Sequence, residues 1–148
     1  MKSVFSMICG AFGSFLTYLF GGWDSILLAL IVFMAIDYIT GSILALVFHK
    51  SPKSESGAYE SRKGFKGLCR KFIILFFVII GHILDNTLGF DYIKNFVCIA
   101  FMTNELLSII ENAGLMGVPI PKVITNAIEL LKKKTEGETA HDETDDLP

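Results

Sequence analysis

The sequence predicts an all-α integral membrane protein with four transmembrane helices, followed by a short amphipathic helix and a disordered acidic tail. Hydrophobic residues make up 52% of its 148 residues and charged residues only 19%, whereas a soluble domain usually carries about 25% charged residues. The mean hydropathy is positive. Four apolar runs approach or exceed the length of about 20 residues that crosses a bilayer. A soluble chain of this size could not hide all four runs in one core.

The first apolar run, residues 3–23, carries no charge and follows the single basic residue Lys2. It is long enough to span a membrane. Small residues recur along one face of the predicted helix, which lets helix backbones approach closely in lipid. They are Gly10, Ser14, Thr17 and Gly21. This face predicts helix packing, either inside one subunit or between subunits.

A cleaved signal peptide is the competing interpretation of the first run, because a basic start and an apolar core are both present. However, the sequence Gly-Gly-Trp-Asp at residues 21–24 stands where a small-x-small cleavage site would lie. A turn with an interfacial tryptophan fits these residues better.

The second run, residues 25–49, contains one charge, Asp37, near its middle. An ionised carboxylate at the bilayer centre costs about 2.5–3.5 kcal/mol on insertion scales, so Asp37 should face protein or water. It is expected either to line a polar path or control assembly, or simply to bond a neighbouring helix. Gly41 and Ala45 form another small pair four residues apart, which predicts close helix packing.

The stretch from residue 50 to residue 71 carries seven basic and two acidic residues. It is predicted to be a cytoplasmic loop, since short basic loops stay on that side of the membrane. Its second half, residues 59–71, is expected to form a short helix on the membrane face, with a basic side on anionic lipid. This side comprises Arg62, Lys63, Lys66, Arg70 and Lys71. Nucleic-acid binding is a poor interpretation, because neither aromatic stacking residues nor a second basic patch accompanies it.

The third run, residues 72–84, reaches spanning length if it extends to Phe90, and His82 and Asp85 then mark its outer interface. The fourth run, residues 95–114, carries one polar face. Its members are Asn104, Glu105, Ser108, Glu111 and Asn112. We expect Asn104, Glu105 and Ser108 to contribute to a pore or an assembly surface. An interfacial helix would show the same stripe, and three spans would then remain.

Residues 1–118 are therefore predicted to form the transmembrane domain, with both termini in the cytoplasm. Glycine and proline break the chain at residues 114–121, and residues 119–134 are predicted to form an amphipathic helix on the anionic leaflet. Residues 135–148 carry six acids and no lysine or arginine. This composition predicts a disordered tail.

No enzyme, cofactor or metal site is expected. The three histidines have neither a nearby nucleophile nor a second metal ligand, and no glycine-rich phosphate loop is present. The three cysteines, Cys9, Cys69 and Cys98, lack the spacing of a zinc site and are expected to stay reduced.

Four short motifs resemble the phage holin family, in the branch of toxin secretion and phage lysis holins from Gram-positive bacteria and their phages. They are Asp-Tyr-Ile-Thr-Gly at 37–41, Glu-Ser-Arg-Lys-Gly at 60–64, Gly-His-Ile-Leu-Asp at 81–85, and the run from Asn104 to Pro121. The resemblance covers roughly residues 22–133. It implies a protein that forms homo-oligomers in the cytoplasmic membrane of a bacterial host and opens lesions there. An endolysin, or in some relatives a toxin, then leaves the cell, and host cell lysis follows. The resemblance does not imply direct contact between the protein and the endolysin or toxin.

Within this interpretation, Asp37 and Glu105 are expected to face each other or the protein interior in the closed assembly, and water in the open one. A second start at Met7 would give a shorter form without Lys2. Two functions from other classes stay open: a small ion channel or transporter, and a nonlethal anchor that recruits partners through its acidic tail.

Overall fold

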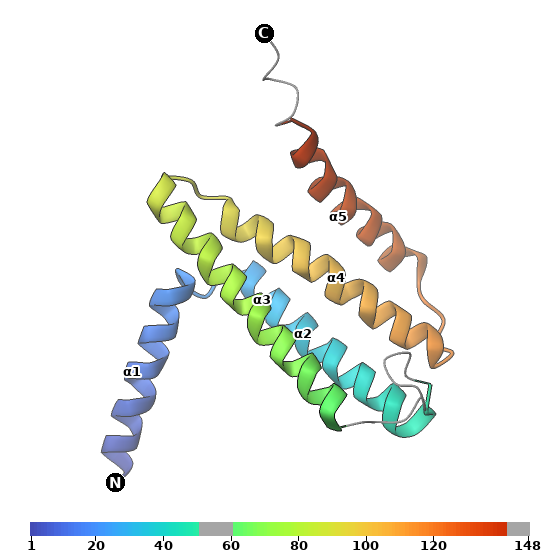
Figure 1. Cartoon of the computed structure of the whole chain (residues 1–148), viewed down its shortest axis with the longest axis horizontal. Coiled ribbons are helices and arrows are strands. Elements are labelled where there is room, and N and C mark those ends of the chain that lie inside the picture. Colours follow the sequence, from blue (N-terminus) through green and yellow to red (C-terminus); the bar gives the residue numbers. More distant parts are fainter. Residues whose placement is uncertain (51–60, 142–148) are drawn as a thin grey trace.

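The computed structural model describes residues 1–50 and 61–141, and within them the chain is helical apart from short connections (Figure 1). The helices are α1 (Lys2–Phe20), α2 (Ser25–Ile43), the π-helical turn η1 (Leu44–Phe48), α3 (Ser61–Leu88), α4 (Ile93–Leu115) and α5 (Lys122–His141). The predicted all-α class is thus confirmed. The first four α-helices, with η1 extending α2, are long and apolar enough to cross a membrane.

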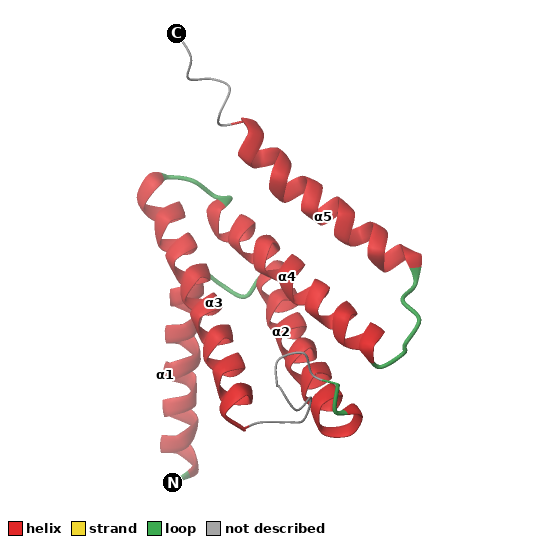
Figure 2. Cartoon of the chain, turned by 45° about the vertical axis from the view of Figure 1, so that its right-hand side comes forward, coloured by secondary structure: helices red, strands yellow, loops and turns green. Residues whose placement is uncertain are grey.

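The core is a three-helix unit of α2, α3 and α4. α4 packs against both α2 and α3, whereas α2 and α3 contact each other less (Figure 2). Leu27 and Leu30 of α2, Val78 of α3 and Cys98 of α4 are fully buried between them. Many large apolar side chains point outward, which is the pattern of a helical unit that lipid would surround.

α1 leaves this unit at a fixed corner. Phe20 is its one buried residue, and most of the helix projects away from α2 (Figures 1 and 2). Gly21 ends α1 in the left-handed conformation, at φ 69°. The Trp23 indole N–H donates to Thr17 Oγ1 at 2.9 Å. A Cβ atom on Gly21 would lie 2.3 Å from the His82 ring, so only glycine lets the corner rest against α3.

The connections at residues 21–24 and 89–92 meet at one end of the bundle, here called the turn end. Asp24 caps α2 by accepting from the Leu27 N–H at 2.8 Å. Asp85 of α3 caps α4, accepting from the N–H groups of Ile93 and Lys94 at 2.9 Å each. Carboxylates at helix N-termini satisfy amides that have no partner inside the helix. Asp85 therefore joins α3 to α4 and does not pair with His82.

Two predicted boundaries differ from the structure. The second half of the basic loop was expected to form a separate short helix on the membrane face, but its residues from Ser61 onward form the first turns of α3, which continues without a break to Leu88. Lysine, arginine and leucine favour helix there. The amphipathic helix was expected to end at residue 134, but α5 continues to His141, through a segment without proline. The rest of the predicted loop and tail, 51–60 and 142–148, lies outside the described residues.

Gly21→Ala is expected to destabilise the protein by roughly 1–2 kcal/mol, because an alanine in the left-handed region is strained, and further because its methyl group would strike the His82 ring. Thermal unfolding in detergent measures this change. Gly67→Ala is the matched control: it lies inside α3 with open space around it, so it should be neutral or stabilising by up to about 1 kcal/mol. Equal losses in both variants would contradict the proposed role of the corner.

Candidate functional site

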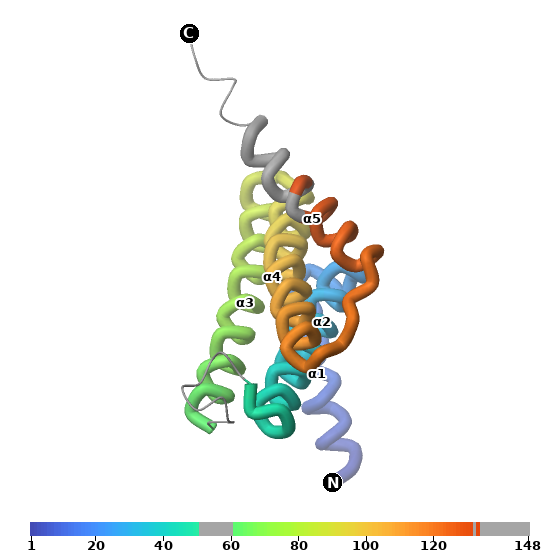
Figure 3. The backbone as a smooth tube through the Cα atoms, turned by 90° about the vertical axis from the view of Figure 1, so that its right-hand side faces the viewer, coloured from blue at the N-terminus to red at the C-terminus, as the bar shows by residue number. Residues whose placement is uncertain are grey.

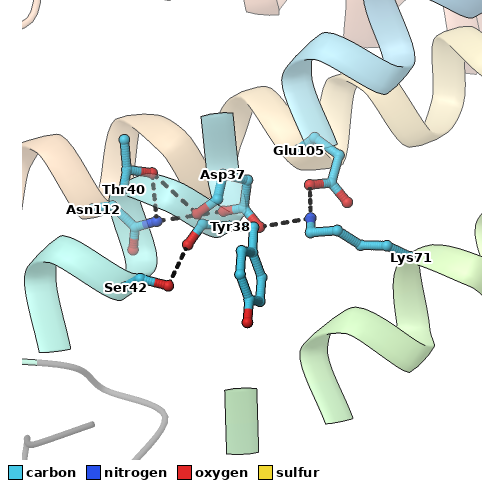
Figure 4. A network of polar contacts seen from close by, with 7 residues as sticks. All are labelled: Asp37, Tyr38, Thr40, Ser42, Lys71, Glu105 and Asn112. Carbon is cyan, nitrogen blue, oxygen red and sulfur yellow. Dashed lines mark hydrogen bonds and ion pairs between the residues drawn. The ribbon is translucent and has the colours of Figure 1, made fainter. Parts of the chain in front are cut away.

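A group of polar side chains lies between α2, α3 and α4, and we call it the core polar network (Figure 4). It comprises Asp37 and Thr40 of α2, Lys71 of α3, and Glu105 and Asn112 of α4. The Lys71 ammonium donates to Asp37 Oδ2 at 2.9 Å and to Glu105 Oε2. The Asn112 amide donates to Asp37 Oδ1 at 3.3 Å and to Thr40 Oγ1 at 3.2 Å. The network therefore joins all three core helices.

The network is positioned by the same helix faces that carry the apolar core. Asp37 follows Leu30 and Met34 on the buried face of α2, and Glu105 lies two turns after Cys98 on that of α4. Each carboxylate lies twelve residues after the first residue of its helix. At 1.5 Å per residue this places both about 18 Å from the turn end, well inside a hydrocarbon core of about 30 Å.

The charges of the network are nearly enclosed. The side chain of Lys71 is 12% exposed, and those of Asp37 and Glu105 are 9% exposed. Such groups are costly in a membrane unless they pair with one another or face water. Among the described residues, no buried side-chain nitrogen or oxygen lacks a hydrogen-bond partner. One ammonium thus serves two carboxylates, and removing it would leave both without their cation.

The structure divides the polar face predicted for α4. Glu105 and Asn112 point into the bundle, whereas Asn104 and Glu111 are exposed and Ser108 is half-buried. Residues three and four apart share a helix face only approximately. Asn104 and Glu111 consequently lie on the flank of α4 and outside the core polar network.

Lys71 was predicted to lie on the basic surface, but the structure places its ammonium inside the bundle. It lies three, seven and ten residues before Ile74, Val78 and Gly81, which are all buried on one face of α3. This spacing turns Lys71 inward, and it is the signal by which the sequence could have separated Lys71 from its neighbours. Arg62, Lys66 and Arg70 are exposed, and Lys63 is half-buried.

The residues predicted for helix packing fall into two groups. Gly21 meets the His82 ring, a Cβ on Gly41 would lie 3.6 Å from the Asn112 amide, and Ala45 is buried. Gly10 and Ser14 are exposed on α1, with nothing near Gly10. A packing role for these two residues therefore requires a second molecule.

A second ion pair closes the turn end, and it was not predicted from the sequence. The buried Lys94 ammonium donates to Asp24 Oδ2 at 2.7 Å. Burial raises the pKa of Asp24, but hydrogen bonds from Lys94 and the Leu27 N–H outweigh it, so the pKa lies below its ordinary value of 3.8. Asp24 thus stays ionised at neutral pH. No group of three or more potential metal ligands occurs in the described part of the chain.

Lys71→Met is expected to lower the free energy of unfolding by about 3 kcal/mol, because it leaves two buried carboxylates without their cation. Chemical unfolding in detergent, followed by circular dichroism, measures the loss. Lys66→Met is the matched control, since Lys66 is exposed on the same helix and should change stability by less than about 0.5 kcal/mol. A Lys71 variant as stable as the control would show that the network does not hold the helices together.

Comparison with known proteins identifies the family. The model of the bacteriophage holin family matches residues 14–133. A Listeria monocytogenes protein, Lmo0128, is 35% identical over 88% of this chain and 89% of its own length. A 14.9 kDa Clostridium perfringens protein encoded in the nagH 3′ region is 34% identical over 82% of this chain and 88% of its own length.

A protein of Bacillus phage phi105 described as a probable holin is 32% identical over 85% of this chain and 87% of its own length. No solved structure matches the chain. The family match points to a membrane protein that is not an enzyme. The matched residues include the whole core polar network, from Asp37 to Asn112. On the basis of this match, the chain belongs to the bacteriophage holin family.

Proposed function

We propose that this protein is a holin that associates with copies of itself in the cytoplasmic membrane and opens lesions there. An endolysin, or a toxin, leaves through these lesions, and the host cell lyses. Membership of the holin family supports this proposal. The observation that carries it is the core polar network, because it places charged groups at a depth where lipid does not tolerate them and a water-filled lesion does.

The distribution of basic residues supports an orientation with both termini in the cytoplasm. Lys2, Lys50 and the exposed basic residues at the start of α3 share one end of the four-helix alternation. The connections at the turn end, residues 21–24 and 89–92, contain two aspartates and no lysine or arginine. Lysine and arginine concentrate on the cytoplasmic side of membrane proteins. The turn end is therefore assigned to the outside.

In the closed state, the network holds α2, α3 and α4 together by pairing its charges internally. When α2 and α4 rotate apart, Asp37, Lys71 and Glu105 lose these partners, and water must replace them. Opening is then favourable only where several copies create a common wet surface. A single ammonium shared by two carboxylates suits this closed state, because moving α3 away from either α2 or α4 breaks one of the two ion pairs.

Contacts between copies are assigned to the face of α1 that carries Gly10 and Ser14. This helix has little contact with its own bundle, and its small residues permit close approach of another helix in lipid. The endolysin or toxin needs no binding site on this protein, because release depends on lesion size alone.

Induced expression in a bacterium, with and without a cytoplasmic endolysin, tests the proposed function. We expect sudden loss of membrane potential in both cultures, and a rapid fall in culture density only when endolysin is present. Membrane potential is followed with a voltage-sensitive dye in the same samples. Loss of potential without endolysin-dependent lysis would indicate a selective ion channel, and continued growth with an intact potential would indicate a transporter or an anchor.

A further inference from the structure

α5 carries apolar residues that its packing leaves uncovered. Ile128 is 5% exposed where α5 contacts α4, whereas Val123 and Leu130 are 78% and 68% exposed. Val123, Ala127 and Leu130 lie four and three residues apart and so form one exposed apolar stripe. Thr125 and Glu129, both exposed, lie on the opposite side. Contact with α4 therefore buries only one edge of the apolar face of α5.

The position of α5 beside α4 is favourable for a chain in water and unfavourable for a chain in a lipid bilayer. α5 runs alongside α4 in the opposite direction (Figures 1 and 3). Thr103, on the face of α4 opposite Glu105, is 5% exposed, as expected for a residue that α5 covers. If α4 crosses a bilayer, α5 in this position carries Glu129 and Lys133 into the hydrocarbon. Charged side chains facing lipid at that depth are strongly disfavoured.

The connection between α4 and α5 permits another direction. Gly117 adopts a left-handed conformation at φ 82°, and the Val118 N–H returns to the Ala113 carbonyl at 3.0 Å, which completes the end of α4. Pro119 and Pro121 have no N–H to continue the helix. α5 thus begins as an independent helix, and backbone hydrogen bonds do not fix its angle to α4.

The charge of α5 identifies what its apolar stripe would contact. The part of α5 that carries the stripe, residues 122–134, contains four lysines and one glutamate, and residues 135–141 add two glutamates. A basic helix with an exposed apolar stripe binds in the plane of an anionic bilayer, with its apolar side toward the acyl chains. We propose that α5 docks on anionic lipid headgroups of the leaflet at the C-terminal end of α4, with Val123, Ala127 and Leu130 facing the acyl chains. This proposal rests on α4 crossing the bilayer and does not depend on lesion formation.

The full chain, reconstituted in vesicles, provides the test. Cys9→Ser, Cys69→Ser and Cys98→Ala remove the native thiols, and Leu130→Cys then carries a fluorescent label. The matched control carries the label at Thr125→Cys on the polar side of α5. Vesicles of phosphatidylglycerol and phosphatidylcholine are compared with vesicles of phosphatidylcholine alone, using a lipid-borne quencher and an aqueous quencher. Circular dichroism confirms that each variant is folded.

In vesicles with phosphatidylglycerol, we expect the lipid-borne quencher to act on the label at 130 and the aqueous quencher on the label at 125. Lys132→Gln, Lys133→Gln and Lys134→Gln together should lower the ratio of docked to undocked α5 roughly 100-fold, since each lysine contributes about fivefold near an anionic surface. Equal quenching at both positions would overturn the proposal. Burial of the label at 130 from both quenchers, or quenching that ignores phosphatidylglycerol, would also overturn it.

Discussion

The bond from one ammonium to two carboxylates is the constraint on which the rest of the structure depends. Lys71 of α3 pairs with Asp37 of α2 and with Glu105 of α4. The three helices must therefore take orientations that bring these three side chains together. In lipid, apolar side chains give little preference for one helix arrangement over another, because the surroundings are equally apolar. Buried charges do give such a preference, since each misplaced helix leaves a charge without its partner.

A second constraint acts at the other end of α4. Asp85 caps its first turn, and Asp24 receives the Lys94 ammonium, so α4 is held to α3 and α2 at the turn end as well as at the network. Among the residues whose burial the structure describes, α1 buries only Phe20 and α5 only Ile128. The molecule therefore consists of a three-helix unit, whose arrangement is set by polar contacts, and two outer helices. We assign α1 to contacts with other copies and α5 to contacts with lipid.

The sequence was sufficient for the class of fold and for identifying two carboxylates within apolar helices. Long apolar runs have few alternatives to spanning helices, and Asp37 and Glu105 are conspicuous within them. Their shared bond to Lys71 was not predictable in the same way, because it depends on which faces of α2, α3 and α4 meet. Lys71 was grouped with its basic neighbours for the same reason. Its spacing from Ile74 and Val78 would have placed it on the buried face of α3.

Helix ends were the least predictable feature. Residues 61–71 were expected to form a short helix separate from the next span, yet they are continuous with it in α3. Composition indicates where lipid begins, and it does not indicate where helical hydrogen bonding stops. The cap of α4 illustrates the same limit, since Asp85 lies eight residues before the Ile93 amide to which it bonds.

We propose that the charges of the network hold the closed arrangement and are also required for opening, so that apolar replacements for all three should keep the fold and lose the opening. The most direct measurement is the onset of endolysin-dependent lysis in a variant that combines Asp37→Leu, Lys71→Met and Glu105→Met. Replacing a whole buried ion network with apolar residues is often neutral or stabilising by about 1–4 kcal/mol. We therefore predict a folded variant, present in the membrane at wild-type amounts, that lyses late or not at all. Lysis at the wild-type time would contradict the account.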